Sequence, residues 1–293
     1  MDYTMVPARV VLSLTGLSAA KIKRLTPLFS TCWETIRKKN GLGKSEKRPG
    51  RPRKIHLRHI LIFVLSYLKT NLTFDGLSAL FLVKRSTFHC LVKKGLDAIE
   101  LAMNNSGNLP ARDYASALSF LLALKGKKAV FIDATERPIR RPKRNQKNFY
   151  SGKKKCHTVK NQIISIKSKK ILCVSQTEQG RIHDFKIFRD QKIADNLPKT
   201  IKIHLYYGYQ GVKKSHPKHK IFIPVKKRRN RELTASEKKS NKTLSSKRIT
   251  VEHAIGGIKR MRAVSEVCRS INFKLRDQKF IVCAGLWNYF IAA

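Results

Sequence analysis

The apolar positions of the first 40 residues recur at helical spacing, as in the series Leu25, Phe29 and Trp33. This pattern predicts a small helical segment over residues 1–40. The composition then changes over residues 41–54 to a mixture of Gly, Pro, Lys and Arg, which is typical of a linker.

The linker contains the sequence Arg51-Pro52-Arg53 directly after Gly50. This short motif resembles the AT-hook, an arm that lies in the A·T-rich minor groove of DNA. Arg51 and Arg53 are therefore candidate DNA contacts. A basic flexible linker without any DNA contact is the alternative interpretation of the same residues.

Three further helical patterns occupy residues 55–105. The first covers residues 59–68 and is apolar on most sides, and the second begins after Thr73, a residue type that caps helices well. The third begins near Ser86 and is predicted to end at Gly95, a stop signal. Three helices with a short turn between the last two predict a helix-turn-helix domain, whose third helix enters the major groove. The side chains that this helix would offer to DNA are Arg85, Ser86, Thr87, His89 and Lys93.

From residue 127 the pattern becomes that of strands alternating with helices. The run Ala129–Ile132 is short and continuously apolar, which is typical of a buried strand. The other predicted elements are a hairpin of strands at 158–166 and 170–177, a helix at 184–189, a strand at 201–207, and helices at 249–262 and 275–291. The polar, basic stretch 226–248 is predicted to be a loop or an inserted arm. These elements predict one α/β domain over residues 127–293, preceded by the all-α helix-turn-helix domain.

Charge restricts the classes of partner. The chain has 63 Lys and Arg against 18 Asp and Glu, a formal charge of +45. So basic a chain repels itself unless it meets a polyanion, and double-stranded DNA releases counterions when its phosphates are neutralised.

The six cysteines include no C-x-x-C pair, which argues against a zinc site and for a reducing compartment. No apolar run approaches the ~18 residues that a membrane span needs, so we expect a cytoplasmic protein without a membrane partner.

Two acidic residues are informative because acids are so few. Asp133 follows the first predicted strand, where a carboxylate is costly to desolvate unless it is paired or binds a metal ion. Pairing with Arg137 and binding of a metal are the two interpretations. Glu252 lies four residues after Arg248 on a predicted helix, and Lys259 lies seven residues further along the same face. A solvent-exposed ion pair would explain Arg248 and Glu252 by themselves.

The order of the elements gives these acids a common context. Cleavage and joining of DNA strands use two divalent cations about 3.5–4 Å apart, held by carboxylates from separate strands and helices. A strand with Asp133, a strand pair, a helix, a strand, a basic insertion and a helix with Glu252 follow one another as in a ribonuclease H-like domain. The expected fold class is therefore α/β, with a ribonuclease H-like mixed sheet flanked by helices.

Several short motifs carry a resemblance to a known family. They are residues 132–138 (IDATERP), 150–153 (YSGK) and 156–160 (CHTVK), His183-Asp184 followed by Ile187-Phe188, and the Arg-x3-Glu-x6-Lys series of Arg248, Glu252 and Lys259. Together with residues 14–18 and 55–100, they make most of the chain resemble the bacterial insertion-sequence transposases of the DDE superfamily, in the branch related to Harbinger elements.

The resemblance implies roles for particular residues. Asp133 and Glu252 would bind Mg²⁺ or Mn²⁺ in a two-metal site, while Arg248 and Lys259 would position Glu252 or contact the DNA backbone. Other side chains expected beside the DNA are Tyr150, Lys153 and Lys160. The partners implied are element ends and target DNA together with further copies of the chain, and no small-molecule substrate.

One position departs from the family pattern. The second metal-binding Asp of the family lies just before a Gly-Tyr pair, and here Tyr206 occupies that position in the sequence LYYGYQG. A neutral phenol cannot replace a bridging carboxylate, because its pKa near 10 keeps it protonated. Asp184, at the start of a predicted helix, is a possible replacement ligand for the metal; the alternative is that Asp184 caps that helix.

Three functions remain open at this point. The first is a transposase that binds the terminal inverted repeats of its element and cuts and joins DNA, with catalysis impaired by Tyr206. The second is a catalytically inactive DNA-binding protein derived from a transposase. The third is a structural RNA-associated or ribosome-associated basic protein, against which the isolated acids argue.

Overall fold

A computed structural model describes residues 6–39, 55–112, 122, 124–227, 229 and 231–292. The AT-hook-like Arg51 and Arg53 lie outside these residues. The chain forms two compact units. The helical unit consists of Met1–Leu109, Ile258–Glu266 and Gln278–Ala293, and the sheet unit of Pro110–Gly257 and Val267–Asp277. Segments that were predicted to belong to the catalytic domain, at 258–266 and 278–293, therefore pack with the helices.

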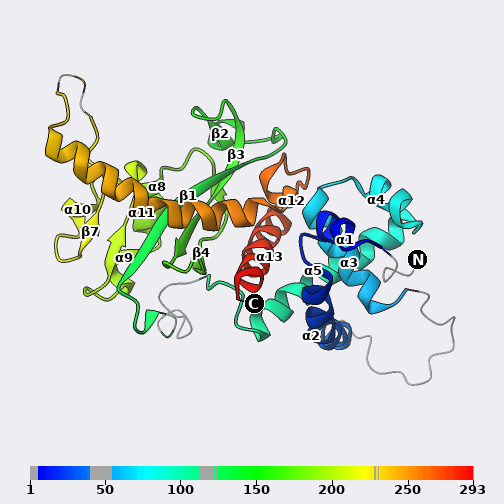
Figure 1. The fold of residues 1–293 in the computed structure, drawn as a ribbon. Coiled ribbons are helices and arrows are strands. Elements are labelled where there is room, and N and C mark those ends of the chain that lie inside the picture. Colours follow the sequence, from blue (N-terminus) through cyan, green and yellow to red (C-terminus); the bar gives the residue numbers. More distant parts are fainter. Residues whose placement is uncertain are drawn as a thin grey trace. The chain divides into compact units, whose positions relative to one another are not determined.

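The helical unit is built around one apolar helix (Figure 1). Its N-terminal elements are α1 (Ala8–Thr15), α2 (Ala19–Lys39), α3 (Leu57–Thr70), α4 (Phe74–Phe81) and α5 (Arg85–Asn105), and near its C-terminal end lie α12 (Arg262–Ser265) and the greater part of α13 (Phe273–Ile291). All residues of α3 from Ile60 to Leu68 are buried, as its continuous apolar sequence predicts. The predicted cap is also confirmed, because Thr73 Oγ1 accepts a hydrogen bond from Gly76 N at 3.1 Å.

Helix α5 does not end at Gly95, as the sequence suggested, but continues to Asn105. Gly95 is buried against α3, where a Cβ atom would lie only 2.4 Å from Cγ2 of Val64. The glycine therefore permits two helices to approach closely, and the stop signal is overridden by packing.

Gly95→Ala should lower the free energy of unfolding by about 1 kcal/mol or more. Alanine favours helix by ~1 kcal/mol, but overpacking costs ~1–3 kcal/mol, and the β-branched side chain of Val64 has little freedom to move away. Gly256→Ala is the matched control, because Gly256 is also helical and a Cβ there meets nothing within 4 Å. Urea unfolding should show the control unchanged or stabilised; a stabilised Gly95→Ala variant would contradict the packing argument.

The sheet unit contains a mixed sheet with the order β2-β3-β1-β6-β7. Its strands are β1 (Ala129–Pro138), β2 (Tyr150–Ser151), β3 (Cys156–Ser165), β4 (Ile171–Val174), β5 (Glu178–Gln179), β6 (Lys202–His204) and β7 (Ile221–Phe222). Strand β3 pairs antiparallel with β1, β4 and β5, whereas β6 pairs parallel with both β1 and β7. The predicted α/β class and the predicted hairpin of β3 and β4 are confirmed.

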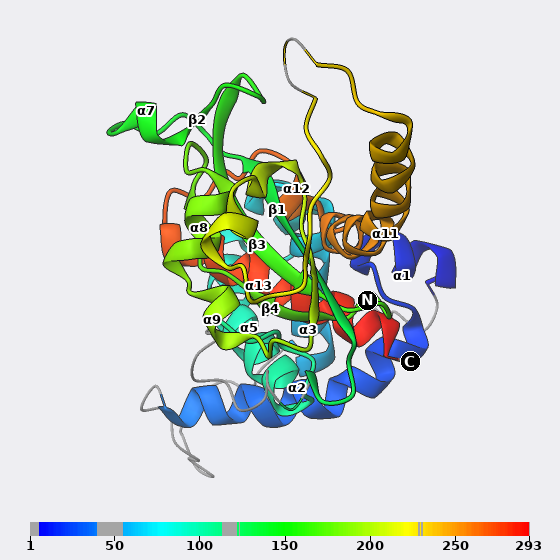
Figure 2. The same cartoon turned by 90° about the vertical axis from the view of Figure 1, so that its left-hand side faces the viewer.

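Helices cover both faces of this sheet (Figure 2). They are α8 (Asp184–Asp190), α9 (Ile193–Asn196), α10 (Val212–Ser215) and α11 (Ala235–Lys259), and a short 3-10 helix forms at Tyr207–Tyr209. Helix α7 (Gln146–Phe149) lies away from the two faces, next to β2. Phe188 of α8 and Ile193 of α9 pack in the main core with Val130 and Ile132 of β1. The opposite face, with Phe131 and Asp133 of the same strand, lies toward α11.

Two sequence expectations are corrected in this unit. Strand β1 continues to Pro138, so Asp133 lies within the strand and not at its end, because antiparallel pairing with β3 extends as far as Thr158. The stretch 226–248 is not a loop throughout, since α11 begins at Ala235 after a cap in which Thr234 and Glu237 exchange hydrogen bonds. Among the described residues, no helix is both long and apolar enough to cross a membrane.

Candidate active site

Asp133 and Tyr206 come from neighbouring parallel strands. The last paired residues of β1 and β6 are Phe131 and His204, and Asp133 and Tyr206 each lie two residues further on. Because side chains alternate along a strand, both point to the face of the sheet that carries Phe131 and His204. The pairing of β1 with β6 therefore brings a phenol to the side of Asp133.

Arg248 of α11 joins the side chains of this face. Its Nε and Nη2 each lie 3.4 Å from Asp133 Oδ2, and its Nη1 lies 2.9 Å from Glu252 Oε1. Its Cζ lies 3.3 Å from the centroid of the Tyr206 ring, so the guanidinium stacks on the phenol. The Arg248 guanidinium thus contacts the carboxylates of Asp133 and Glu252, and also Tyr206, which occupies the position of the family's second metal-binding Asp.

The environment of Asp133 is unusual for a carboxylate. Only 8% of the residue is exposed, and burial raises the pKa of its carboxyl above the ordinary value. Arg248 and the Ala134 N–H, which donates to Oδ1 at 2.9 Å, act in the opposite direction, and the charge of Asp184 raises the pKa further. The 45% exposed side chain of Glu252, by contrast, lies at the surface end of the cluster.

A second charged group centres on Lys160 of β3, which is 7% exposed. Its Nζ lies 2.8 Å from Asp184 Oδ1 and 3.5 Å from Glu136 Oε1, and it donates to the Ile182 carbonyl at 2.8 Å. Three protein groups thus bind the ammonium of Lys160, and its contact with DNA stays a prediction. The sequence analysis did not identify Glu136. This residue lies three positions after Asp133 on β1, so its side chain is on the opposite face of the strand.

Asp184 does not cap its helix. His183 is the N-cap of α8, and its Nδ1 accepts from the Phe185 N–H. Asp184 begins the helix, where an acidic side chain is favourable to the helix dipole, and its carboxylate is held by Lys160. The turn after Tyr206 also approaches it, because a Cβ on Gly208 would lie 2.3 Å from Asp184 Oδ2.

Within the described ranges, no three His, Cys, Asp or Glu side chains are grouped closely enough to hold a metal ion. The reason lies in the contacts above. Asp133 and Glu252 both bind Arg248, Asp184 binds Lys160, and Tyr206 offers a stacked ring and not a carboxylate. The side chains as arranged therefore do not fit the two-metal site that the sequence predicted.

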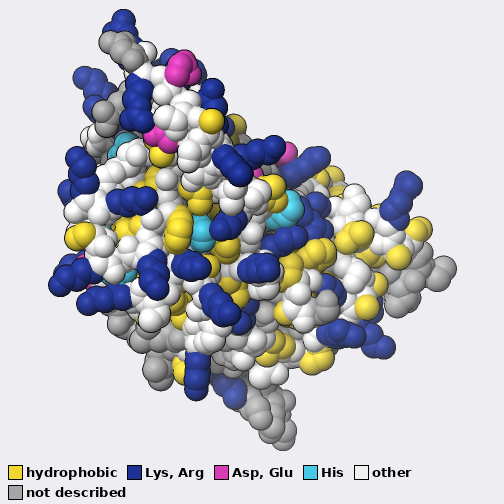
Figure 3. Space-filling model, turned by 60° about the vertical axis from the view of Figure 1, so that its left-hand side comes forward, with side chains coloured by type: hydrophobic (Ala, Val, Ile, Leu, Met, Phe, Trp, Pro, Cys, Tyr) yellow, Lys and Arg dark blue, Asp and Glu magenta, His cyan; other side chains and the backbone are white. Residues whose placement is uncertain are grey.

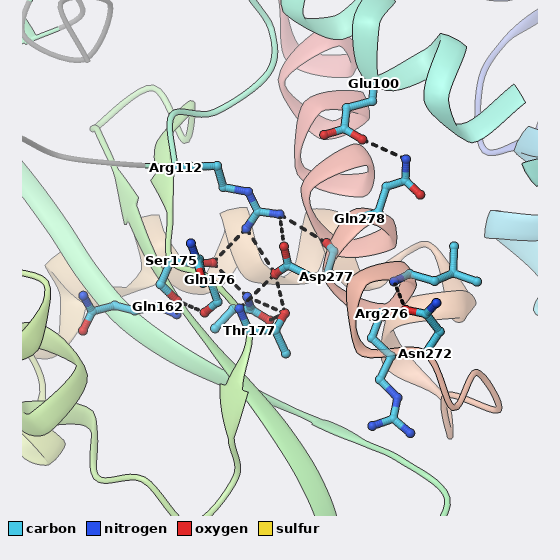
Figure 4. A network of polar contacts seen from close by, with 12 residues as sticks. Glu100, Arg112, Gln162, Ser175, Gln176, Thr177, Asn272, Arg276, Asp277 and Gln278 are labelled. Carbon is cyan, nitrogen blue, oxygen red and sulfur yellow. Dashed lines mark hydrogen bonds and ion pairs between the residues drawn. The ribbon is translucent and has the colours of Figure 1, made fainter. Parts of the chain in front are cut away.

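Arg137, the alternative partner of Asp133, lies elsewhere. It is 1% exposed, and its guanidinium donates to Asn161 Oδ1 at 2.7 Å, to Thr177 Oγ1 at 3.1 Å and to the Arg276 carbonyl at 3.3 Å. Thr177 in turn donates to Asp277, which also pairs with Arg112 (Figure 4). Arg137 thus belongs to a structural network, and the pairing of Asp133 with Arg137 is wrong.

The remaining site candidates are distributed over the two units. Lys259, the last residue of α11, belongs to the helical unit. In that unit the predicted DNA contacts Arg85, Ser86, Thr87, His89 and Lys93 are all exposed. In the sheet unit Tyr150 and Lys153 are exposed as well.

His204, next to the cluster, predicts a dependence of stability on pH. Its ring is stacked between those of Phe131 and Phe222, with both centroid distances 5.0 Å. Burial first, and then the charges of Lys247 and Lys202, lower the pKa of His204 to about 4. The folded state disfavours the protonated ring. The contribution of the neutral His204 to the free energy of unfolding is therefore fully present above about pH 6.5 and is lost as the pH falls toward 4.

In thermal unfolding between pH 7 and pH 4, His204→Gln should therefore lose less stability than the unmodified chain. Acidic groups titrate equally in both proteins, so the difference between the two curves isolates the histidine. Parallel curves through this range would contradict the assigned environment of His204.

Comparison with known proteins supports the same assignment as the motifs. Residues 132–288 match a family described as DDE superfamily endonuclease. Over 283 residues the chain is 29% identical to a probable transposase for insertion sequence element IS702 from Microchaete diplosiphon, which covers 94% of this chain and 96% of that protein. No solved structure matches the chain significantly.

Proposed function

The chain belongs to the DDE superfamily endonucleases, and from this premise we propose that it binds the terminal inverted repeats of its own element but is impaired in cutting and joining DNA. The observation that carries the second part is the contact of Arg248 with Asp133, Glu252 and Tyr206. The similarity to a transposase over nearly the whole length supports the first part.

DNA recognition is assigned to the helical unit. Helices α4 and α5 are separated only by residues 82–84, and this length supports the assignment of a helix-turn-helix motif. Arg85, Ser86 and Thr87 form the exposed first turn of α5, from which such motifs contact base edges in the major groove. His89 and Lys93 continue this face along the helix. The ends of the element would be bound by an oligomer of this chain.

The sheet unit is assigned a ribonuclease H-like fold. An antiparallel pair, β3 and β1, continues into the parallel strands β6 and β7, with helices on both faces. This topology supports the assignment because it brings Asp133 on the central strand and the residue at position 206 on its neighbour to one face. Glu252 then approaches from α11.

Impaired catalysis follows from what occupies this face. Endonucleases of this superfamily generally use divalent metal ions, which bind negatively charged oxygen ligands. Here the carboxylates of Asp133 and Glu252 are already paired with Arg248, and Tyr206 supplies no negative charge. The cost of removing one bridging ligand is several kcal/mol of transition-state stabilisation, with each ~1.4 kcal/mol equal to about tenfold in rate.

A fully inactive DNA-binding protein is the second candidate, favoured by the same Tyr206. The two candidates differ in residual cleavage, and one preparation tests both. Binding of duplexes with and without the element's ends is measured in EDTA, and nicking of the same duplexes is measured in Mg²⁺ and in Mn²⁺. Preferential binding with slow, metal-dependent nicking supports the impaired enzyme, binding without nicking supports the inactive protein, and no preference for the ends would refute the proposed recognition.

A further inference from the structure

A segment of the sheet unit between β1 and β3 is the most strongly basic part of the chain that the structure describes. Residues 140–155 include eight Lys and Arg and no Asp or Glu. Half of this segment is therefore cationic, whereas the whole chain has 63 Lys and Arg in 293 residues. The cations are Arg140, Arg141, Lys143, Arg144, Lys147, Lys153, Lys154 and Lys155, and every one is exposed. We call this segment the basic arm.

The basic arm is an ordered element that extends from the sheet, with α7 and β2 projecting at the upper left of Figure 2. Phe149 packs at its base against a small apolar cluster of Ile139, Val159 and Cys268. Beside it, the Asn148 carbonyl accepts a hydrogen bond from Arg181 N at 3.1 Å. Strand β2 pairs with the first residues of β3, which fixes the chain on both sides of the turn at 152–155. These contacts hold the arm without using its charges.

The charges of the arm are not neutralised within the protein. Among the described residues, no ion pair joins any of the eight cations to a carboxylate, and the one side-chain bond that they make is from Arg141 Nε to the neutral Gln146 Oε1 at 2.9 Å. The face shown in the space-filling view carries many separate Lys and Arg side chains and few acidic ones (Figure 3). Holding eight like charges on 16 residues is unfavourable unless a polyanion binds them.

From this we infer that the basic arm is a second DNA-binding surface, which contacts the phosphate backbone of duplex DNA without regard to sequence. Lys and Arg side chains on a short arm are suited to successive phosphates, which lie on each strand at a regular spacing. Recognition of the element's ends stays with the helical unit, to which the predicted helix-turn-helix belongs. The inference rests on the proposed function only in that DNA is the partner.

The test compares two variants of the full chain with equal changes of charge. In the arm variant, Lys143, Lys147, Lys153 and Lys154 are each replaced with Gln. In the control variant the same replacement is made at Lys167, Lys199, Lys214 and Lys218, which are exposed in the same unit. Lys167 follows β3 at the end opposite to the arm. Affinity for a duplex of arbitrary sequence and for an end duplex is measured over 50–300 mM salt, and thermal unfolding checks that both variants fold.

The slope of log affinity against log salt falls by about 0.9 for each phosphate that the protein no longer neutralises. We expect the slope of the arm variant to fall by about two units or more, and its affinity at 0.1 M salt to fall on the order of tenfold or more, on both duplexes. Its preference for the end duplex should stay as in the unmodified chain, and the effect on the control should be less than half as large.

Equal effects in the two variants would overturn the inference, because the effect would then belong to general surface charge. An unchanged slope in the arm variant, or a weaker affinity seen with duplex RNA and not with duplex DNA, would overturn it as well. If the unmodified chain binds DNA but does not prefer the end duplex, the proposed function fails while the arm can still pass its test. The two failures are therefore distinguishable.

Discussion

Tyr206→Asp is expected to raise metal-dependent nicking of end DNA by about 100-fold or more over the unmodified chain. The substitution supplies a carboxylate near Asp133, two residues after the end of the neighbouring parallel strand β6. It also removes the ring on which Arg248 stacks, so the guanidinium loses one of the groups that hold it between Asp133 and Glu252. Nicking of labelled duplex in Mg²⁺ and in Mn²⁺ measures the effect.

Two controls separate these causes. Tyr206→Asn removes the ring without adding charge, and it should stay near the activity of the unmodified chain. Asp133→Asn in the Tyr206→Asp background should abolish the gain. If Tyr206→Asn nicks as well as Tyr206→Asp, the ring and not the missing carboxylate is what blocks the site. If the unmodified chain already nicks as fast as Tyr206→Asp, and Asp184→Ala abolishes both activities, Asp184 acts in place of the missing ligand.

Arg137→Ala should lower the free energy of unfolding by about 3–5 kcal/mol. The side chain is among the largest that the described core buries completely, so truncation leaves a cavity. It also removes the donor that Asn161 and Thr177 share, and a hydrogen bond to a charged group contributes ~1.5–3 kcal/mol. Urea unfolding followed by circular dichroism measures the change.

Two further variants serve as controls for Arg137→Ala. One keeps most of the side-chain volume at position 137, and the other truncates an arginine that is not buried. Arg137→Met retains most of the packing, and its destabilisation should be smaller than that of Arg137→Ala. Arg140→Ala changes the same residue type at an exposed position three residues later, and it should change stability by less than ~0.5 kcal/mol. A destabilisation at Arg137 no larger than at Arg140 would show that the buried network contributes little.

Local patterns predicted much of this fold. The apolar run of α3, the Thr73 cap and the hairpin of β3 and β4 depend on neighbouring residues, so they could be identified from sequence. The helix stop at Gly95 and the end of β1 at Asp133 were predicted wrongly, because packing against α3 and pairing with β3 decide those two points. Such contacts join residues far apart in the chain, where periodicity gives no information.

The residues of the candidate site could be predicted from sequence only in part, as with the fold. Asp133, Arg248 and Glu252 could be identified from motif spacing, and the structure brings them together with Tyr206. The pairing of Lys160 with Asp184, and the place of Arg137 in a separate network, could not be predicted. Each depends on which face of β1 or β3 a side chain occupies after the strands pair, and a shift of one residue reverses that face.

The stacked Tyr206 has a consequence at the level of the gene. Every tyrosine codon becomes an aspartate codon by a change of its first base alone. Asp133 and Glu252 are both joined to position 206 through Arg248. A population that carries this gene would therefore generate the allele with a carboxylate at this position at the ordinary rate of point mutation. Under the proposed function, that single nucleotide change separates an impaired element from a competent one.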